Sequence, residues 1–378
     1  MQVPKYFYVI VGGGLAGLQL ARQLSRDIFF KGKQIAVIDP DFKAPSKTWS
    51  FWEKAEGKWE NLVSKSWKDG RFITSELNKR LDLEPYRYKM IKAEDFYRET
   101  LSELQSSPDI YLIRDEISEI DPVTRKAIGQ LDNYTATHFF DSRVNPEYLE
   151  EGKHTLIYQH FKGWEIETSE PVFSPEEFTM MDYRLKYKDA TAFTYVLPVS
   201  ETKALVEYTF FTPFLTEESV YDEMLKRYLK EFLKVKDFRI ISTETGIIPM
   251  TDFPFEAENT SKITKIGTGG GWVKASTGYS FKNTEKMVDT IIDNIKSGKL
   301  PGENLISKKF KRYDGIFLDV LAHNNQKGED IFTKFYTKNT PEEIFSYLDQ
   351  ETVFSEDLKI MMSLYSFDFI KSFFRKNF

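Results

Sequence analysis

The sequence predicts an α/β protein with a doubly wound parallel sheet, an inserted domain built on an antiparallel sheet, and helices at the C-terminal end. Three observations predict this fold. Residues 6–24 form an apolar run that breaks into glycines and resumes with helical spacing. Residues from about His154 to Phe211 alternate aromatic and β-branched positions between turns. A second glycine-rich segment, Gly267–Gly278, again separates a strand pattern from a helix pattern.

The first glycine segment has the G-x-G-x-x-G spacing of a Rossmann-like dinucleotide-binding loop. The first glycine permits a tight turn, the second lets a pyrophosphate approach the backbone, and the third lets the helix pack against the strand. An acid at the end of the next predicted strand is placed to bind a ribose hydroxyl. The alternative is a glycine-rich turn without a ligand, and the loop alone leaves NAD and FAD open. The predicted cofactor contacts here are Gly12, Gly14, Leu15, Ala16, Gly17 and Asp39.

The composition of the chain indicates which kinds of partner, such as nucleic acid, metal ions or membranes, it is expected to bind. A chain of 378 residues with a net charge of −6 is not expected to bind nucleic acid, which usually requires a clustered basic surface. The chain has no cysteine and only 4 histidines, without metal-ligand spacing, so no metal site is predicted. We see no signal-peptide pattern and no run of about 18 apolar residues. These features predict a cytoplasmic protein whose contact with a membrane, if any, is superficial.

The next segments fill in the first domain. Lys47–Trp52 is an aromatic cluster after two prolines, and we expect it to be a loop at the ligand end of the sheet. Residues 93–105 have helical periodicity, and an apolar strand ends at Asp141 and Arg143, which is plausible as a cofactor edge. The predicted domains are residues 1–153 with 240–300 for the nucleotide-binding domain, 154–239 for the inserted sheet, and 301–378 for a C-terminal helical region.

With these motifs placed, the chain resembles the flavin-dependent lycopene β-cyclases over nearly its whole length. Several of the motifs are specific only in combination and in this order. The motifs that carry the resemblance are Val11–Gly17, Thr48–Trp52, Phe140–Arg143, Met181-Asp182, Tyr195–Pro198, Ala204–Thr209, Glu244–Pro249 and Lys274–Tyr279.

The resemblance implies the fold of FAD-dependent hydroxylases and geranylgeranyl reductases. It implies an intramolecular lyase or isomerase that closes the acyclic ends of lycopene into β-ionone rings, without net redox change. It also implies FAD as cofactor, active in its reduced form, with NAD(P)H as electron donor. Many relatives of this fold carry Gly-Asp where this chain has Gly267-Thr268, which puts that aspartate contact in doubt. Further predicted cofactor contacts are Trp49, Arg143, Gly269, Thr277 and Gly278.

Ring closure requires an acid that protonates a double bond, a base, and surroundings that stabilise a carbocation. Glu207 lies in an apolar strand and matches a glutamate of the family, so we predict that it is the principal catalytic residue, against the alternative of a solvent-facing strand residue. Relatives carry a second acid where this chain has Tyr208, which puts a carboxylate pair in doubt. Asp182 is the second candidate acid or base, or else an ordinary buried aspartate. Aromatic candidates for the cation, or for the core, are Trp164, Phe193 and Tyr195.

Lycopene dissolves in membranes, so the resemblance implies contact with a membrane surface. In residues 360–378, five polar side chains form a narrow stripe on an otherwise apolar helix. Such a helix either lies in the membrane interface or docks against the protein. Rival functions are an FAD-dependent polyprenyl reductase or hydroxylase, and a carotenoid-binding flavoprotein without turnover. The stripe residues are Asp368, Lys371, Ser372, Arg375 and Lys376.

Overall fold

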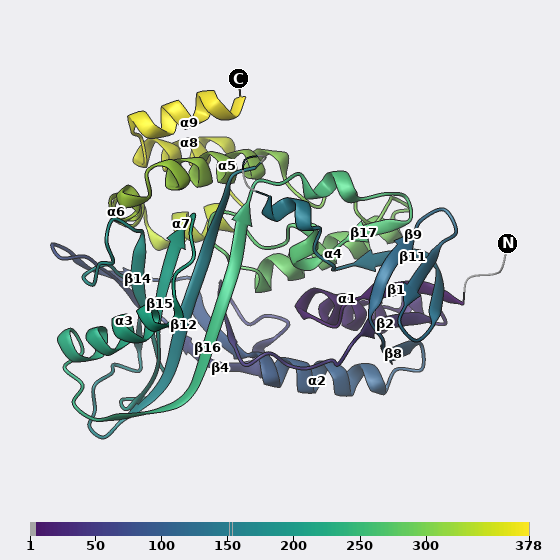
Figure 1. The fold of residues 1–378 in the computed structure, drawn as a ribbon, viewed down its shortest axis with the longest axis horizontal. Helices are drawn as coiled ribbons and strands as arrows, with labels where there is room; N and C mark the ends of the chain where they lie inside the picture. Colours follow the sequence, from purple (N-terminus) through teal and green to yellow (C-terminus); the bar gives the residue numbers. More distant parts are fainter. Residues whose placement is uncertain (1–4, 151, 153, 378) are drawn as a thin grey trace. The chain divides into compact units, whose positions relative to one another are not determined.

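The structure is a computed structural model that describes residues 5–150, 152 and 154–377 (Figure 1). The chain forms two compact units, each assembled from three segments. Unit 1 contains Met1–Pro45, Ala93–Glu150 and Phe253–Lys311. Unit 2 contains Ser46–Lys92, Glu151–Asp252 and Arg312–Phe378.

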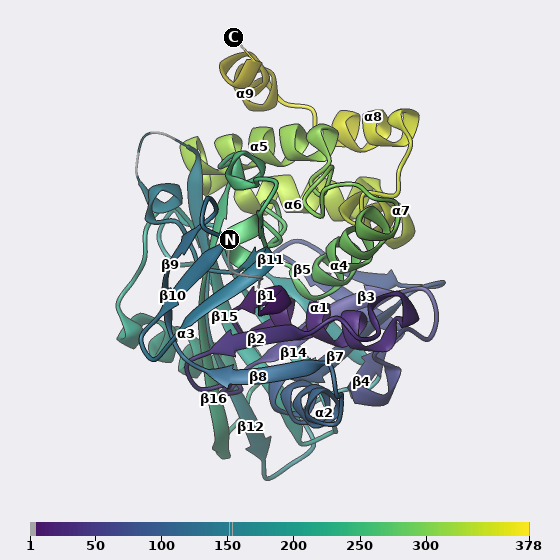
Figure 2. The same cartoon turned by 90° about the vertical axis from the view of Figure 1, so that its right-hand side faces the viewer.

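Unit 1 is built on a seven-stranded sheet of order β8-β2-β1-β11-β10-β9, with β17 paired to β11. The strands β8, β2, β1, β11 and β17 run parallel, while β9 and β10 form an antiparallel extension. Figure 2 shows β8, β2, β1, β11, β10 and β9 side by side. The strands are β1 (Tyr6–Val11), β2 (Ile35–Asp39), β8 (Ile110–Arg114), β9 (Ile117–Asp121), β10 (Lys126–Gly129), β11 (Asn133–Asp141) and β17 (Ile263–Lys265).

Helices and the β9–β10 extension cover the two faces of this sheet. The helices α1 (Leu15–Arg26), α2 (Ala93–Gln105) and α4 (Phe281–Lys296) pack together, with α1 against β1. On the opposite face, alternate residues of β1 and β2 form one buried apolar cluster with Ile117 and Ile120 of β9. Because β1 and β2 are buried on both sides, they read as continuous apolar runs in the sequence.

Unit 2 is built on a second seven-stranded sheet, of order β16-β12-β15-β14-β13-β5-β6, and a three-stranded sheet, β3-β7-β4. The larger sheet is antiparallel as predicted, except that β13 pairs with β5 in parallel. The strands are β3 (Thr48–Glu53), β4 (Val63–Trp67), β5 (Asp69–Ile73), β6 (Asn78–Asp82), β7 (Arg87–Lys92), β12 (Leu156–Thr168), β13 (Glu177–Asp182), β14 (Ala192–Pro198), β15 (Lys203–Thr212) and β16 (Phe238–Thr251).

The two faces of the larger sheet have different neighbours. Helix α3 (Glu218–Glu231) lies along β12 and β15 and shares a buried apolar cluster with alternate residues of these strands (Figure 1). Tyr88 of the three-stranded sheet stacks on Phe178, with ring centroids 4.3 Å apart, and accepts a hydrogen bond from Tyr195 at 2.7 Å. The even-numbered residues of β15 face α3, so its odd-numbered residues face the other way.

The C-terminal part of unit 2 is helical, as predicted. Phe332 of α6 stacks on Tyr183, which directly follows β13, and Tyr336 of α6 stacks on Phe72 of β5. Phe345 of α7 stacks on Trp52. The helices are α5 (Lys308–His323), α6 (Gly328–Lys338), α7 (Pro341–Leu348), α8 (Phe354–Ser363) and α9 (Phe367–Asn377). Among the described residues, no helix combines the length and the apolar character needed to cross a membrane.

One predicted element is wrong. Lys47–Trp52 was expected to be a loop, but Thr48–Glu53 forms β3, paired antiparallel with β7. Within this strand the side chains of Trp49 and Phe51 are buried while Thr48 and Ser50 are less so. This alternation is the pattern of a half-buried strand, and it outweighs the two preceding prolines.

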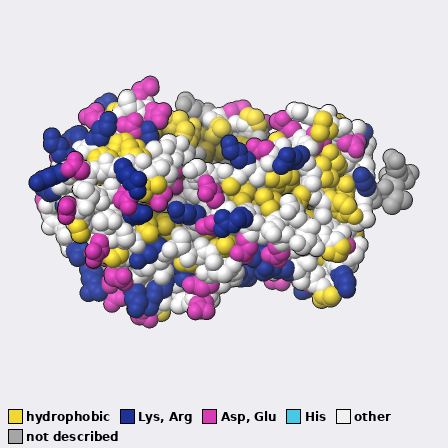
Figure 3. All heavy atoms as spheres, turned by 90° about the horizontal axis from the view of Figure 1, so that it is seen from below, with side chains coloured by type: hydrophobic (Ala, Val, Ile, Leu, Met, Phe, Trp, Pro, Cys, Tyr) yellow, Lys and Arg dark blue, Asp and Glu magenta, His cyan; other side chains and the backbone are white. Residues whose placement is uncertain are grey.

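The two units also divide the chain differently from the predicted domains. Residues 46–92 and the whole of β16 belong to unit 2, because β5 pairs with β13 and β16 pairs with β12. The segment up to Lys311 belongs to unit 1. The predicted boundaries at residues 1, 153 and 378 lie outside the described residues. On the face in Figure 3, basic and acidic side chains are interspersed with hydrophobic patches.

Candidate functional site

In unit 1, two glycines of the first loop are required by close contacts. Gly12 has a positive φ of 105°, and a Cβ on it would lie 1.9 Å from Ser142 Oγ. A Cβ on Gly17 would lie 2.0 Å from the carbonyl oxygen of Gly12. Gly12 therefore makes the tight turn after β1, and Gly17 lets α1 pack closely against it.

Gly14 has a different role. It precedes α1 with ordinary backbone angles, φ −80° and ψ −172°. Among the described residues, none places an atom within 4 Å of a Cβ built on Gly14, and none caps the helix with a side chain. The space beside Gly14, at the start of α1, is therefore open, as a phosphate-binding helix terminus requires.

Asp39 lies at the end of β2, beside this loop. Its carboxylate accepts a hydrogen bond from the backbone N–H of Gly13 at 2.7 Å and from that of Phe42 at 2.9 Å. These bonds hold the carboxylate next to the glycine turn. The structure thus places Asp39 with the loop, as the sequence spacing predicts.

The second glycine segment also lies against the start of α1. A Cβ on Gly267, which has a positive φ of 60°, would lie 3.1 Å from Ala16 Cβ. A Cβ on Gly269 would lie 2.4 Å from the carbonyl oxygen of Arg143. Two glycine-rich strand-to-helix connections of unit 1 therefore converge on one helix terminus.

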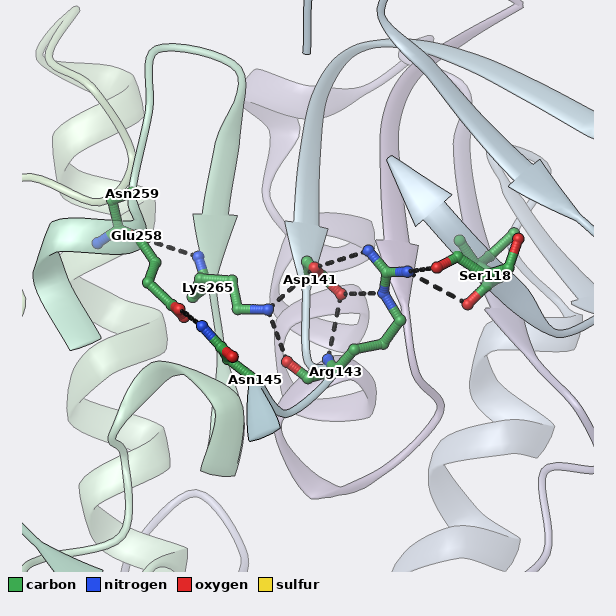
Figure 4. A network of polar contacts seen from close by, with 8 residues as sticks. Ser118, Asp141, Arg143, Asn145, Glu258, Asn259 and Lys265 are labelled. Atoms are coloured by element: carbon green, nitrogen blue, oxygen red, sulfur yellow. Dashed lines mark hydrogen bonds and ion pairs between the residues drawn. The ribbon is translucent and has the colours of Figure 1, made fainter. Parts of the chain in front are cut away.

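Asp141, at the end of β11, holds a buried polar network at this edge (Figure 4). Arg143 donates to its carboxylate through Nε at 2.9 Å, and Lys265 does so through Nζ at 3.0 Å. Burial alone raises the pKa of Asp141, but these two cations hold it below its ordinary value. Arg143 also donates to the carbonyl oxygen of Ser118 at 2.6 Å. The guanidinium of Arg143 therefore connects the end of β11 to β9. The sequence predicted that Arg143 contacts the cofactor.

The remaining predicted cofactor contacts, Thr277, Gly278 and Trp49, do not belong to the loop before α1. Thr277 and Gly278 lie in the turn before α4, where both backbone N–H groups donate to the carbonyl oxygen of Lys274. Trp49 is a buried residue of β3 and belongs to unit 2.

In unit 2, Glu207 is buried, with 7% of the residue exposed. It lies on β15 between Gly163 of β12 and Tyr195 of β14, on the sheet face opposite α3. Burial raises the pKa of Glu207 to about 8, and the charge of Glu244 adds to this rise. A hydrogen bond from Thr209 opposes it. Glu207 therefore keeps its proton at neutral pH.

A second carboxyl group lies on the same face. Glu244 of β16 pairs with Gly163 from the other side, so the two glutamates flank a residue without a side chain. A Cβ on Gly163 would lie 3.2 Å from Glu244 Cγ and 3.6 Å from Glu207 Cβ. Burial raises the pKa of Glu244 to about 7, although hydrogen bonds from Thr48 lower it.

Asp182 does not join this pair. Its carboxylate lies on the α3 side of the sheet, where it accepts a hydrogen bond from Tyr228 at 2.8 Å. Arg184 forms an ion pair with it. These partners make Asp182 a structural anchor between β13 and α3, and its proposed acid–base role finds no support in this geometry.

The aromatic candidates also divide between the two faces. Trp164 belongs to the apolar cluster under α3. Tyr195 is in register with Glu207, and Phe193 follows the same face of β14. Only these two therefore share the side of the sheet that holds the carboxyl pair.

Glu244 was missed as a site residue, although its motif was noted. The available signal was its position in Glu244–Pro249, an acid at the centre of a strand with a Gly-Ile-Ile-Pro continuation. What joins it to Glu207 is the register of β16 and β15 on β12, which a single sequence does not specify.

Comparison with known proteins decides the family. The family model described as "Lycopene cyclase protein" matches residues 8–374. This chain belongs to the lycopene cyclase family. A curated lycopene beta-cyclase from Paracoccus sp. (strain N81106 / MBIC 01143) is 26% identical over 143 residues. That match spans 36% of this lycopene cyclase family chain and 36% of the relative.

Solved structures share the fold of this lycopene cyclase family protein. A geranylgeranyl bacteriochlorophyll reductase-like protein from Thermoplasma acidophilum aligns with a TM-score of 0.61 and 12% identity, over 98% of this chain and 99% of that one. A halogenase PltM variant in complex with FAD aligns with a TM-score of 0.56 and 10% identity, over 92% of this chain and 79% of that one. The predicted fold class is therefore confirmed.

Proposed function

We propose that this protein is a lycopene β-cyclase that uses FAD and converts acyclic ends of lycopene into β-ionone rings without net redox change. The observation that carries this proposal is Glu207, a buried carboxyl group that keeps its proton at neutral pH in a chain of the lycopene cyclase family. Cyclisation by protonation needs such an acid, because an ionised carboxylate has no proton to give.

The reaction consists of proton movements on the substrate. Glu207 donates its proton to a terminal double bond, which leaves a tertiary carbocation. The neighbouring double bond attacks this cation, and the Glu207 carboxylate accepts a ring proton, which makes the product neutral and restores the acid. Tyr195 and Phe193 stand on the same face as Glu207, where aromatic rings stabilise a cation by about 0.5–2 kcal/mol each.

The residues of unit 1 fit a dinucleotide. The open space at Gly14 admits a pyrophosphate, the start of α1 supplies N–H donors, and Asp39 lies beside the loop. The bound group is FAD in its reduced form, with NAD(P)H as electron donor. A reduced flavin, when bound, supplies negative charge, which is the kind of charge that stabilises a carbocation.

The FAD-dependent oxidoreductase remains the second candidate, because the solved neighbours include a reductase-like protein and halogenases. The two functions differ in their use of electrons. A cyclase consumes no NADPH in proportion to product, whereas a polyprenyl reductase or hydroxylase does. A carotenoid-binding flavoprotein retains lycopene unchanged.

The test is anaerobic incubation of the purified protein with lycopene, FAD and dithionite or NADPH, followed by chromatography of the carotenoids. We expect ring-containing product without stoichiometric NADPH oxidation. We expect Glu207→Gln to bind FAD normally and to lose at least about 10²-fold in rate, as for removal of a general acid. Absence of cyclised product from the parent protein sinks the proposal, and a fully active Glu207→Gln sinks the catalytic assignment.

We further propose that α9 presents a membrane-facing surface. Its polar stripe points toward unit 2: Ser372 donates to the carbonyl oxygen of Ile316 at 3.0 Å, and Arg375 donates to Asp319. Its apolar side faces outward, since Phe367 is 77% exposed and Phe374 is 57% exposed. A helix that docks through its polar side and exposes aromatic rings suits the boundary between headgroups and acyl chains.

Helix α8 extends this apolar surface. Exposed apolar side chains recur along α8 at roughly helical spacing and continue into the turn before α9. Exposed basic groups lie nearby, including Lys371. Since lycopene dissolves in lipid, such a surface brings the enzyme to its substrate. The exposed apolar residues are Val353, Phe354, Leu358, Met362, Tyr365, Phe367, Phe373 and Phe374.

A further inference from the structure

Glu207 and Glu244 lie on the same side of the larger sheet, with a glycine of β12 between them. Gly163 is the cross-strand partner of both residues, and it has no side chain to separate or to hydrogen-bond them. Both glutamates are largely buried, with 7% and 9% of the residue exposed. Two buried carboxyl groups that lie on one side of a sheet and interact electrostatically do not both ionise readily, so the charge of Glu244 raises the affinity of Glu207 for its proton.

The surroundings of the two carboxyl groups are unequal. Glu244 accepts hydrogen bonds from the backbone N–H of Thr48 at 2.9 Å and from its hydroxyl at 3.2 Å. Lys47 is buried and interacts electrostatically with Glu244. The hydroxyl of Thr209 hydrogen-bonds to Glu207. Hydrogen-bond donors and a cation stabilise an ionised carboxylate, so Glu244 gives up its proton first.

We propose that Glu244 is a positioning residue whose carboxylate, held by Thr48 and Lys47, keeps the neighbouring Glu207 protonated and ready to donate. The inference rests on the proposed function, since it concerns the acid that cyclisation requires. This chain would then also have a pair of carboxyl groups. Its second acid comes from β16, whereas in the relatives the second acid directly follows the glutamate in sequence.

Other charged groups bear on the pair. Glu165, on the same face of β12, raises the pKa of Glu244 and is itself paired with Lys92 at 3.5 Å. Lys47 opposes this effect. The burial of Lys47 lowers its own pKa, which the charge of Glu244 offsets in part. Among these groups, Glu244 is the one that acts directly on Glu207.

The test is a titration of Glu207 in the purified protein, followed by the infrared band of its protonated carboxyl group and assigned by the loss of that band in Glu207→Gln. We expect Glu244→Gln to lower the pKa of Glu207 by about one unit or more, because it removes a nearby like charge. The alkaline limb of cyclase activity should move to lower pH by the same amount. As a matched control, Glu167→Gln removes a carboxylate at the end of β12, beside Arg239, and should change neither the pKa of Glu207 nor the alkaline limb.

A reciprocal arm covers the case in which Glu244→Gln does not fold. Because Glu244 loses its proton first, it titrates beside a neutral Glu207, so Glu207→Gln should leave the pKa of Glu244 nearly unchanged. An unchanged pKa of Glu207 in Glu244→Gln overturns the inference, and so does a lowered pKa of Glu244 in Glu207→Gln, because that result would mean that Glu207 ionises first. Either result contradicts the role of Glu244 but not the proposed function. Absence of cyclised product from the parent protein contradicts the proposed function, and the pKa of Glu207 can still be measured in that case.

Discussion

At the scale of single residues, a buried acid that keeps its proton is also a source of instability at high pH. The pKa of Glu207 rises from an ordinary value of 4.5 to about 8 on folding. Between these values the folded state binds a proton that the unfolded state releases. The free energy of unfolding therefore falls as pH rises from about 4.5 to about 8.

The first prediction is that Glu207→Gln stabilises the protein at alkaline pH. Glutamine cannot ionise, so this part of the pH dependence disappears, and the gain at pH 8 is on the order of a few kcal/mol. Denaturant unfolding at pH 5, 6, 7 and 8 measures it. Parallel stability curves for the variant and the parent would show that Glu207 ionises as freely in the folded protein as in the unfolded chain.

The glycines of the first loop give a second, paired prediction. A Cβ on Gly17 would collide with the backbone of Gly12, so Gly17→Ala should lower the free energy of unfolding by about 1–3 kcal/mol. Gly14 has ordinary backbone angles and open space around its Cβ, so Gly14→Ala should fold normally. If a pyrophosphate approaches there, the added methyl group weakens FAD binding.

Flavin fluorescence titration and thermal unfolding separate the two effects. Gly14→Ala should lose FAD affinity by about tenfold or more at unchanged stability, while Gly17→Ala loses stability even without cofactor. Unchanged FAD affinity in Gly14→Ala would place the pyrophosphate elsewhere.

At the scale of elements, strong local patterns were predicted and tertiary pairings were not. The helix over residues 93–105 agrees with α2, because its apolar residues repeat at helical spacing. The strand β3 was missed because the prolines before it were given more weight than its alternation. The parallel pairing of β13 with β5 joins segments separated by more than a hundred residues, and no local pattern reports it.

The third prediction concerns α9. Replacing Phe367, Phe373 and Phe374 together by serine should reduce binding to phosphatidylcholine–phosphatidylglycerol vesicles by on the order of tenfold or more, since each ring removes apolar area from the interface. Flotation of the vesicles measures the bound fraction. The substitutions face away from the polar contacts of α9, so thermal stability should change little.

A matched control uses exposed apolar residues elsewhere. Ile28, Val123 and Leu131 are 78%, 82% and 80% exposed and belong to unit 1. Replacing these three by serine removes comparable exposed area and should leave vesicle binding intact. Equal losses in both triple variants would mean that binding depends on general hydrophobicity, with no special role for α9.

At the scale of the whole molecule, the sequence predicted the class of fold and singled out Glu207, but it did not place Glu244 on the same side of the sheet. Glu207 was identifiable because a local motif carries it. Glu244 lies on β16, which the prediction assigned to the nucleotide-binding domain, whereas pairing with β12 puts it in unit 2. Segments of both units alternate along the chain, so domain limits drawn from the order of predicted strands and helices differ from the limits of the two units.

This alternation leads to the last prediction. The chain passes between the units at residues 45/46, 92/93, 150/151, 252/253 and 311/312, so neither unit is one continuous segment. FAD binds the loop of unit 1 in our proposal, and at 100 times its dissociation constant it adds about 2.7 kcal/mol to the free energy of unfolding. Because the units are interleaved in sequence, we expect unit 2 to unfold with unit 1 and to share this stabilisation.

Tryptophan fluorescence measures this coupling, because five of the 6 tryptophans belong to unit 2: Trp49, Trp52, Trp59, Trp67 and Trp164. In urea titrations with and without FAD, the tryptophan midpoint should rise together with the midpoint of flavin release. Gly14→Ala is the control, since weakened FAD binding should abolish both shifts at the same FAD concentration. A flavin midpoint that rises while the tryptophan midpoint stays fixed would show that the units unfold independently despite their interleaved segments.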